Sequence, residues 1–293
     1  MVYIGNIYSM NFVLNNRNER KHEENKMIEK AKKDPQRRAA FITIIFLTAA
    51  PLITPFSIPL QDLTGEDIIQ KVDDLMSTQT AYAKMKMTIE TTSGQKRTFL
   101  YESWTKDEGE KNLIRYLEPS RVKDQAVLML NNANDIWMFF PRTQRVRKLA
   151  THAKKQKMQG SDFSYEDMGG SGEFEEDFES ERLQDEQKNG HDCYKVELIR
   201  KPESNISYSR LLIWVIKENF YPIVIEYYDE EDPTYLQKTL TQSDIEVIDG
   251  IPTAKKMVMQ NLNDQTQTVM EVVEIKYDVE LDDRMFTERS LKR

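Results

Sequence analysis

Residues 83–104 read AKMKMTIETTSGQKRTFLYESW and predict two strands joined by a turn. In the first half, Met85, Met87 and Ile89 alternate with polar residues, which is the period of a strand with one apolar and one wet face. A Ser-Gly pair then supplies a turn, and the residues after it are rich in aromatic and β-branched types. The stretch therefore predicts an antiparallel hairpin.

Segments of the same kind recur along most of the chain, separated by short turn signals such as Asn189-Gly190 and Asp249-Gly250. No helical patterns alternate with them, which argues against a parallel βα architecture. We therefore predict an α+β fold built on one large, curved antiparallel sheet of about 11 strands. After the hairpin, the predicted strands are 111–118, 125–131, 135–140, 145–149, 191–200, 207–217, 221–229, 235–247, 251–262 and 267–280.

Residues 64–78, TGEDIIQKVDDLMST, predict a helix before the first strand. Thr64 is a good N-cap, and two acidic residues occupy the first turn. Ile68 and Ile69 begin an apolar stripe at helical spacing, so we expect the helix to pack on the apolar face of the sheet. A short closing helix is expected in residues 282–293.

The amino terminus has the order of a secretory signal. Five basic residues between Lys30 and Arg38 precede an uncharged run from Ala39 to Ala50. That run is shorter than the roughly 20 residues of a membrane span. We predict a non-native extension in residues 1–26, a cleaved signal peptide in residues 27–60 and a single periplasmic domain in residues 61–293. An uncleaved inner-membrane anchor is the alternative.

The negative net charge of the chain is carried by the residues that follow the predicted signal. Residues 1–60 hold nine Lys/Arg and five Asp/Glu, so residues 61–293 hold 32 basic and 44 acidic side chains, a net charge of −12. An acidic body disfavours a nucleic-acid partner, because phosphate contacts need clustered cations. It also disfavours adsorption to anionic membranes, except through a local basic patch.

The sequence contains few residues or motifs of the kinds that catalytic and metal sites need. Cys193 is the only cysteine, and only His152 and His191 follow the predicted signal, so multi-Cys and H-E-x-x-H metal sites are excluded. His191 and Cys193 share a face of a predicted strand, which allows a Cys–His dyad, although an ordinary strand pair beside a turn is the simpler interpretation. The acidic run 229–232 is a weak calcium candidate. With no G-x-S-x-G or P-loop, we expect no catalytic residue, metal, cofactor or enzymatic activity.

The region 150–182 breaks the strand pattern. It contains several glycines and the segment GSDFSYED at residues 160–167. Ser164 followed by Asp167 fits the signature of a helix start. A short helix over one mouth of the sheet and an ordinary surface loop are both compatible with this composition.

The stretch from Trp137 to Met168 resembles the LolA-like outer-membrane lipoprotein-sorting proteins. In that family an aromatic strand ends in a proline, a basic strand follows, and a Gly-Ser-Asp-Phe-Ser/Thr-Tyr-Glu-Asp segment comes next. Residues 160–167 match this segment in full. The resemblance covers roughly residues 62–293, and the larger size of this chain places it in a divergent branch.

The resemblance implies an unclosed β-barrel, wrapped around helices, whose apolar cavity shields the acyl chains of a lipid or lipoprotein. Methionine suits such a cavity because it adapts to variable apolar shapes; a filled core is the alternative. The expected lid and motif residues are Gly160, Ser161, Asp162, Phe163, Tyr165, Glu166 and Asp167. The expected cavity lining is Met85, Met87, Ile89, Phe99, Tyr101, Met129, Trp137, Phe139, Phe163, Met168, Trp214 and Met259.

The partners that the resemblance implies are a lipid or lipoprotein cargo and an RND-type or ABC-type inner-membrane exporter as donor. A monomer is expected for a shuttle. Arg142, Arg145 and Arg147 are candidates for gating the cargo, with a solvated basic strand as the alternative. A competing interpretation is a periplasmic sensor or adaptor that uses the same half-barrel to bind a protein partner. A hydrolase is disfavoured because no nucleophile motif is present.

Overall fold

The computed structural model describes residues 62–169 and 174–292. The predicted extension in residues 1–26 and the predicted signal peptide in residues 27–60 lie outside the described residues. Among the helices of the described part, none is both long enough and apolar enough to cross a membrane.

The hairpin expected at residues 83–104 forms as β1 (Thr80–Glu90) and β2 (Lys96–Lys106), with Met87 opposite Phe99. Every later strand also pairs in the antiparallel sense. These strands are β3 (Lys111–Glu118), β4 (Ala126–Leu130), β5 (Asp135–Phe140), β6 (Arg145–Lys148), β7 (Phe178–Arg182), β8 (Glu186–Lys188), β9 (His191–Arg200), β10 (Arg210–Ile216), β11 (Pro222–Tyr228), β12 (Leu236–Ile248), β13 (Ile251–Asn261) and β14 (Thr266–Tyr277).

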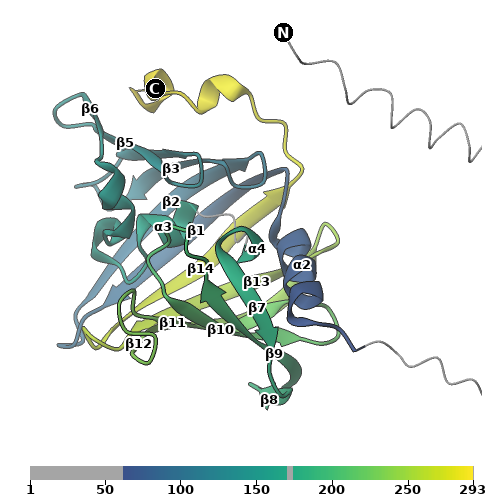
Figure 1. The fold of residues 1–293 in the computed structure, drawn as a ribbon. Helices are drawn as coiled ribbons and strands as arrows, with labels where there is room; N and C mark the ends of the chain where they lie inside the picture. Colours follow the sequence, from purple (N-terminus) through teal and green to yellow (C-terminus); the bar gives the residue numbers. More distant parts are fainter. Residues whose placement is uncertain (1–61, 170–173, 293) are drawn as a thin grey trace, which may run out of the picture. The chain divides into compact units, whose positions relative to one another are not determined.

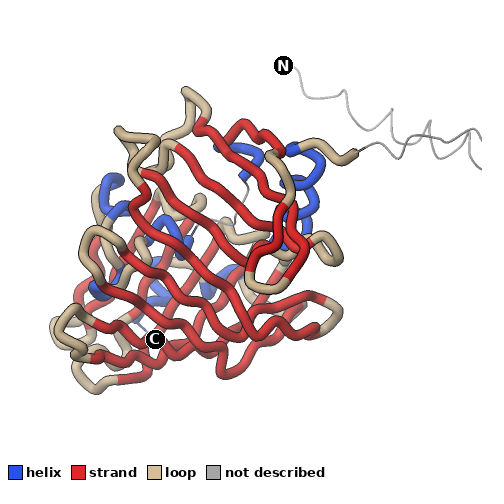
Figure 2. Tube along the Cα trace, turned by 90° about the horizontal axis from the view of Figure 1, so that it is seen from below, coloured by secondary structure: helices blue, strands red, loops and turns tan. Residues whose placement is uncertain are grey.

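Two meanders join to make one sheet. The strand order is β6-β5-β4-β3-β2-β1-β14-β13-β12-β11-β10-β9-β7, and β8 pairs with β9 beside this path. The junction is the long pairing of β1 with β14, and the edges β6 and β7 are not paired with each other in the described part of the chain. The sheet curves around the helices that lie between β6 and β7 in Figures 1 and 2. The predicted unclosed antiparallel sheet is therefore confirmed.

The described residues form 14 strands rather than about 11. Two of them, β7 and β8, lie outside every predicted segment and come from a charged stretch in which only Phe178 is buried. Period-two alternation cannot be recognised in such a stretch, because an edge strand leaves most of its side chains in water.

The predicted helix before the first strand forms as α2 (Gly65–Met76). The Thr64 hydroxyl accepts a hydrogen bond from the Asp67 N–H (3.1 Å), and the Asp67 carboxylate accepts one from the Thr64 N–H (2.8 Å). This reciprocal capping box satisfies two of the backbone donors that a helix start leaves unpaired. Ile68 and Ile69 of α2 are buried in the main core cluster.

The carboxyl end differs from the expected helix. It forms two short 3₁₀ helices, η4 (Asp283–Met285) and η5 (Glu288–Lys292). Phe286 and Leu291 are buried against Leu113, Leu128 and Phe139 of β3 to β5. The end of the chain therefore covers an apolar patch on the outer face of the sheet.

Candidate functional site

The inner face of the sheet, defined here by the core cluster that includes Ile68 and Ile69 of α2, is apolar across both meanders. Side chains alternate between faces along each strand, which places the matching residues of neighbouring strands together. The members from β1, β2, β4, β13 and β14 are at most 7% exposed and are rich in methionine: Met85, Met87, Ile89, Phe99, Tyr101, Met129, Met259 and Met270.

The connection between the two edge strands crosses this inner face. β6 ends at Lys148 on one edge and β7 begins at Phe178 on the other, so the chain between them has to traverse the sheet. We call residues 151–169 the cover segment; it consists of η2 (Thr151–Lys155), η3 (Met158–Gly160) and α3 (Tyr165–Gly169). The short helix α4 (Phe174–Asp177) follows it.

The cover segment inserts apolar side chains into the inner face. Met158, Phe163 and Tyr165 are at most 4% exposed and belong to the same core cluster as the methionines of the sheet. Burial raises the pKa of Tyr165 to about 12, so its phenol is neutral at physiological pH. Met168 is only partly buried against the cluster. The cover segment thus shields the inner face from water.

The start of α3 is a second capping box. The Ser164 hydroxyl accepts from the Asp167 N–H (3.1 Å), and the Asp167 carboxylate accepts from the Ser164 N–H (2.6 Å). Of the two alternatives for this region, a short helix and a surface loop, the helix forms after Ser164.

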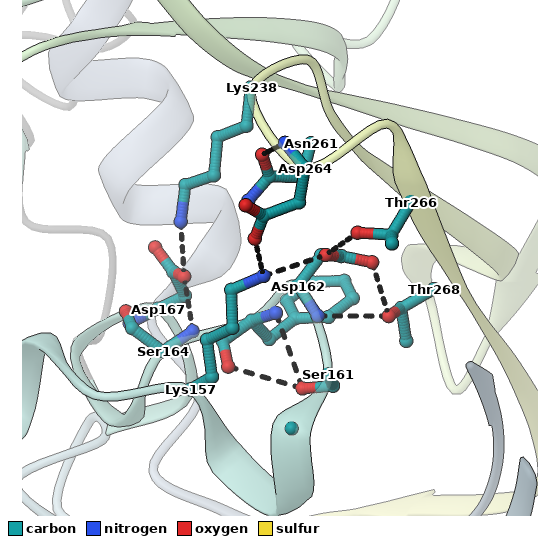
Figure 3. A network of polar contacts seen from close by, with 12 residues as sticks. Lys157, Ser161, Asp162, Ser164, Asp167, Lys238, Asn261, Asp264, Thr266 and Thr268 are labelled. Carbon is teal, nitrogen blue, oxygen red and sulfur yellow. Dashed lines mark hydrogen bonds and ion pairs between the residues drawn. The ribbon is translucent and has the colours of Figure 1, made fainter. Parts of the chain in front are cut away.

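Asp162 fastens the middle of the cover segment to β14. Its carboxylate is 1% exposed and accepts hydrogen bonds from the hydroxyls of Thr266 (2.6 Å) and Thr268 (2.8 Å). The Asp162 N–H donates to the Thr268 hydroxyl (2.9 Å), and the Lys157 ammonium lies 3.3 Å from the carboxylate. Figure 3 shows this cluster beside the Ser164–Asp167 box. A fully bonded carboxylate is a strong local anchor because each hydrogen bond is charge-assisted.

Asp167 fastens α3 to the other half of the sheet. Its carboxylate pairs with the ammonium of Lys238 on β12, and both side chains are almost completely buried. The Tyr208 hydroxyl donates to the second carboxylate oxygen (2.7 Å), and the Lys238 ammonium lies 4.8 Å from the centroid of the Tyr208 ring. Burial first, and then the charge of Asp167, raise the pKa of Tyr208 well above its usual value.

A second buried ion pair joins the two ends of the cover segment. The ammonium of Lys154 lies 3.3 Å from the carboxylate of Glu166, and each side chain is 9% exposed. Glu166 also accepts from the Ser207 N–H (3.2 Å), and Lys154 donates to Asn205. Polar contacts to several strands and loops therefore hold an otherwise apolar insert in place.

Gly160 lies where the cover segment meets β2. Its φ of +72° belongs to the left-handed region that glycine adopts without strain. An added Cβ would come within 3.3 Å of the Arg97 guanidinium, which donates to the Gly160 carbonyl (3.4 Å). A glycine here gives the turn its shape and leaves room for Arg97.

The comparisons with known proteins agree with this geometry. A family model described as an uncharacterized protein family matches residues 108–293. A putative outer membrane lipoprotein-sorting protein domain from Vibrio parahaemolyticus is similar in structure, with 25% identity, a TM-score of 0.69, and coverage of 78% of this chain and 98% of the other. The chain belongs to the family that the model of residues 108–293 describes, and its fold is LolA-like.

Two further structures share the LolA-like fold. A DUF1329 family protein from Desulfovibrio piger has 27% identity and a TM-score of 0.69, covering 78% of this chain and 97% of the other. A LolA superfamily protein from Nitrosomonas europaea has 23% identity and a TM-score of 0.65, with coverage of 78% and 99%. A search among curated proteins gave no match.

The LolA-like fold divides the predicted cavity lining between faces. Eight of the predicted residues lie buried in the inner cluster. Trp137 and Phe139 of β5 instead belong to the outer cluster under the carboxyl end, so their prediction as cavity lining is wrong. Their neighbours Ile136 and Met138 point inward. In β5 both faces are apolar, so the alternation that identifies the inner face is absent from its sequence.

The prediction that Trp214 of β10 lines the cavity is wrong for the same reason. Leu211, Ile213 and Val215 belong to the inner cluster, whereas Trp214 lies with Cys193 in a separate cluster on the alternate face. Its indole N–H donates to Glu186 of β8, and Lys188 lies 3.8 Å from the centroid of its ring.

A cleft of about 330 Å³ lies beside α3. Glu166 and Asp167 line it from the cover segment. Phe178 lines it from β7, Leu211 from β10, and Tyr208 from the loop between β9 and β10. Its lining is part polar and part apolar. It adjoins the inner cluster, to which Tyr208, Leu211 and Phe178 also belong.

Several anchoring residues were not predicted. Lys238, Thr266 and Thr268 lie far from residues 160–167 in sequence, and only the fold brings them there; Lys154 is close in sequence, but its pairing with Glu166 depends on how the cover segment folds. Lys238 carried one signal, because it shares the period-two position of the buried Leu240 in β12. The gating candidates Arg142, Arg145 and Arg147 are exposed, and within the described residues no ion pair or hydrogen bond joins them to the cover segment.

The residues weighed for catalysis have structural roles. Cys193 is fully buried, and burial raises the pKa of its thiol, which keeps it in the unreactive form. His191 is exposed at the start of β9. Asp229 accepts the N–H groups of Glu231 and Asp232 and so shapes its own turn. Within the described residues, no group of three or more His, Cys, Asp or Glu is arranged to hold a metal ion.

Proposed function

We propose that this chain is a periplasmic carrier that binds the acyl chains of a lipid or lipoprotein on its inner face and carries them toward the outer membrane. The observation that carries the proposal is the cover segment. A methionine-rich apolar face is shielded by a short insert whose attachments are mostly polar, rather than by a second sheet. Such a face can exchange one apolar occupant for another.

The hydrophobic energies of the two occupants are of similar size. Burying one acyl chain is worth of order 10 kcal/mol, at about 0.8 kcal/mol for each CH₂. Met158, Phe163 and Tyr165 together contribute about 5 to 9 kcal/mol, at about 1.5 to 3 kcal/mol each. Cargo that replaces these three side chains therefore gains only a few kcal/mol net, which suits a carrier that has to release it.

The polar anchors favour the same exchange. Lys154, Glu166, Asp167 and Lys238 all lose hydration when the cover segment is closed. The attraction within a buried ion pair roughly balances this desolvation, so reopening the segment returns the charges to water at low net cost. The pairs set the position of the closed segment more than they stabilise it.

The remaining parts of the proposal rest on the sequence and on relatives. A signal peptide in residues 27–60 would export the chain, and the Vibrio parahaemolyticus relative is named as a lipoprotein-sorting domain. An RND-type or ABC-type exporter is the proposed donor of the cargo. A monomer without enzymatic activity or nucleic-acid partner is the form that this role requires.

The first test is native mass spectrometry, with lipid extraction, on the chain purified gently from the cell envelope. Excess mass in the phospholipid or lipoprotein range is expected. The cover segment can be locked by replacing the contacting residues Lys157 and Asp264 with cysteine, in a Cys193→Ser background, and bridging them with a bifunctional maleimide.

The locked protein should lose the excess mass, whereas the same variant without the bridge should keep it. Trp137→Gln should also keep the excess mass, because Trp137 lies on the outer face, and it serves as the control for a substitution away from the inner face. A mass that stays that of the bare chain after incubation with lipids and lipopeptides would reject the carrier. The search would then turn to a protein partner of a sensor or adaptor.

A further inference from the structure

One end of the first meander gathers basic side chains. Because the strands are antiparallel, the β1–β2 turn, the loop 119–125 and the β5–β6 turn all lie at this end, as the pairs Leu100 with Glu118 and Ala126 with Phe139 show. In Figure 1 these turns lie along the left-hand side. We call their exposed cations the arginine rim: Arg97, Arg121, Lys123, Arg142, Arg145 and Arg147.

The arginine rim is not neutralised by the protein. Among the described residues, no carboxylate lies within ion-pairing distance of any of its six cations, whereas Lys96 in the same region pairs with Glu90 at 3.3 Å. Glu118 and Asp124 are the acidic residues that the loop at this end adds. A region of net positive charge thus occurs within residues 61–293, which carry a net charge of −12.

Aromatic rings of the inner face support two of these arginines. The Arg121 guanidinium lies 5.5 Å from the centroid of the Phe99 ring, and that of Arg147 lies 5.8 Å from the centroid of Phe140. Both rings belong to the inner cluster or pack against it. Stacking leaves the edge of a guanidinium free to donate two parallel hydrogen bonds to a phosphate.

The width of the rim indicates a surface rather than a single small anion. It extends from β2 to β6, four strand spacings of about 4.8 Å, or roughly 19 Å. That distance exceeds one phosphate and matches several neighbouring head groups. The acidic remainder of the chain is repelled by the same surface, so the arginine rim is the part of the first meander that would approach it.

We propose that the arginine rim docks the protein on an anionic phospholipid bilayer, with this end of the inner face directed at the membrane. The docking stands on the charges of the rim and does not require that the chain carries lipid. The sequence alone disfavoured membrane adsorption, because a net charge conceals how the fold sorts the cations.

The test is co-sedimentation of the full chain with vesicles of phosphatidylcholine alone and of phosphatidylcholine mixed with phosphatidylglycerol. Binding is expected only with phosphatidylglycerol and should weaken as salt rises, because the charges are screened. The variant R121Q/R145Q/R147Q should bind roughly a hundredfold more weakly, since each basic residue near such a surface contributes about fivefold.

The matched control is K71Q/K84Q/K256Q, which removes the same charge from three lysines of α2, β1 and β13 that have no ion pair in the described part. Its binding should stay close to that of the parent. Equal losses in both variants, or no binding to phosphatidylglycerol vesicles, would overturn the proposal. Capture by immobilised polyglutamate without vesicle binding would overturn it in favour of an acidic protein partner.

Thermal unfolding of each variant shows whether the substitutions leave the fold intact. Native mass spectrometry of the rim variant separates docking from carriage. Retained lipid mass with lost vesicle binding means that the carrier survives and only docking is lost.

Discussion

Asp167 of the cover segment and Lys238 of β12, 71 residues apart in sequence, form an ion pair with side chains only 5% and 6% exposed. The pair ties the short helix α3 to the second meander, while Asp162 ties the preceding residues to β14. Two carboxylates of one short segment thus determine where the cover lies on the inner face.

Asp167→Asn should lower the free energy of unfolding by about 3 to 5 kcal/mol, because Lys238 stays buried without a countercharge. Urea unfolding measures the loss. Adding Lys238→Met should recover most of it by removing the unpaired charge. Glu271→Gln is the control, since its pair with Lys86 is 45% and 46% exposed and should contribute about 1 kcal/mol at most. A loss as small as the control would mean that the Asp167 pair is solvated.

Asp162→Ala should loosen the cover segment without unfolding the sheet. The substitution removes the acceptor for Thr266, Thr268 and Lys157. Hydrogen exchange should accelerate in residues 158–168 and stay unchanged in α2. An apolar fluorescent probe should also bind more strongly as the inner face opens. Asp264→Ala, which removes only an exposed partner of Lys157, should do neither; uniform acceleration across the chain would instead indicate global destabilisation.

Gly65→Ala should destabilise the packing of α2 on β7. A Cβ at Gly65 would lie 2.8 Å from the Arg182 nitrogen and 2.9 Å from the Glu181 carbonyl carbon, both backbone atoms that cannot move alone. The expected cost is about 1 to 3 kcal/mol, measured by thermal unfolding. Gln70→Ala on the exposed side of α2 should change stability by about 0.5 kcal/mol or less. Equal melting temperatures for the two variants would show that α2 can shift.

Phe286→Ala should lower stability by about 3 to 5 kcal/mol, because Phe286 is 5% exposed and fills the outer cluster. Lipid bound per folded molecule should be unchanged, since this cluster lies on the face opposite the inner methionines. Denaturant unfolding and native mass spectrometry on the same preparation measure both quantities. Loss of lipid from a folded Phe286→Ala protein would contradict the proposal that lipid binds on the inner face.

Stability should fall as pH rises above 10. Burial raises the pKa of Tyr101, Tyr116, Tyr165 and Tyr227 above the usual value of 10.0, to about 12 for Tyr165. Between pH 10 and these raised values the unfolded chain releases phenolic protons and the folded chain retains them. The stabilisation is therefore complete below pH 10 and is lost at higher pH.

Near-ultraviolet titration of the phenolate absorbance tests this expectation. The buried tyrosines should ionise only together with unfolding. A single smooth titration of all tyrosines before unfolding would contradict it.

The sequence by itself determined most strands of the two meanders, the helix α2 and the LolA-like character of the chain, and it marked Ser164 as a possible helix start. These features depend on local patterns: period-two alternation in β1, capping at Thr64 and Ser164, and an eight-residue motif. Each is read within a few neighbouring residues, because strand faces and helix starts are local consequences of backbone geometry.

The tertiary structure alone decided which apolar residues face inward and which cations stay unpaired. β5 and β10 are apolar on both faces, so Trp137, Phe139 and Trp214 were assigned inward although each contributes to another cluster. Lys238 became an anchor and Arg121 part of a rim because pairing of distant strands placed one beside Asp167 and left the other in water. Burial and charge pairing are sums over neighbours that only the folded chain assembles.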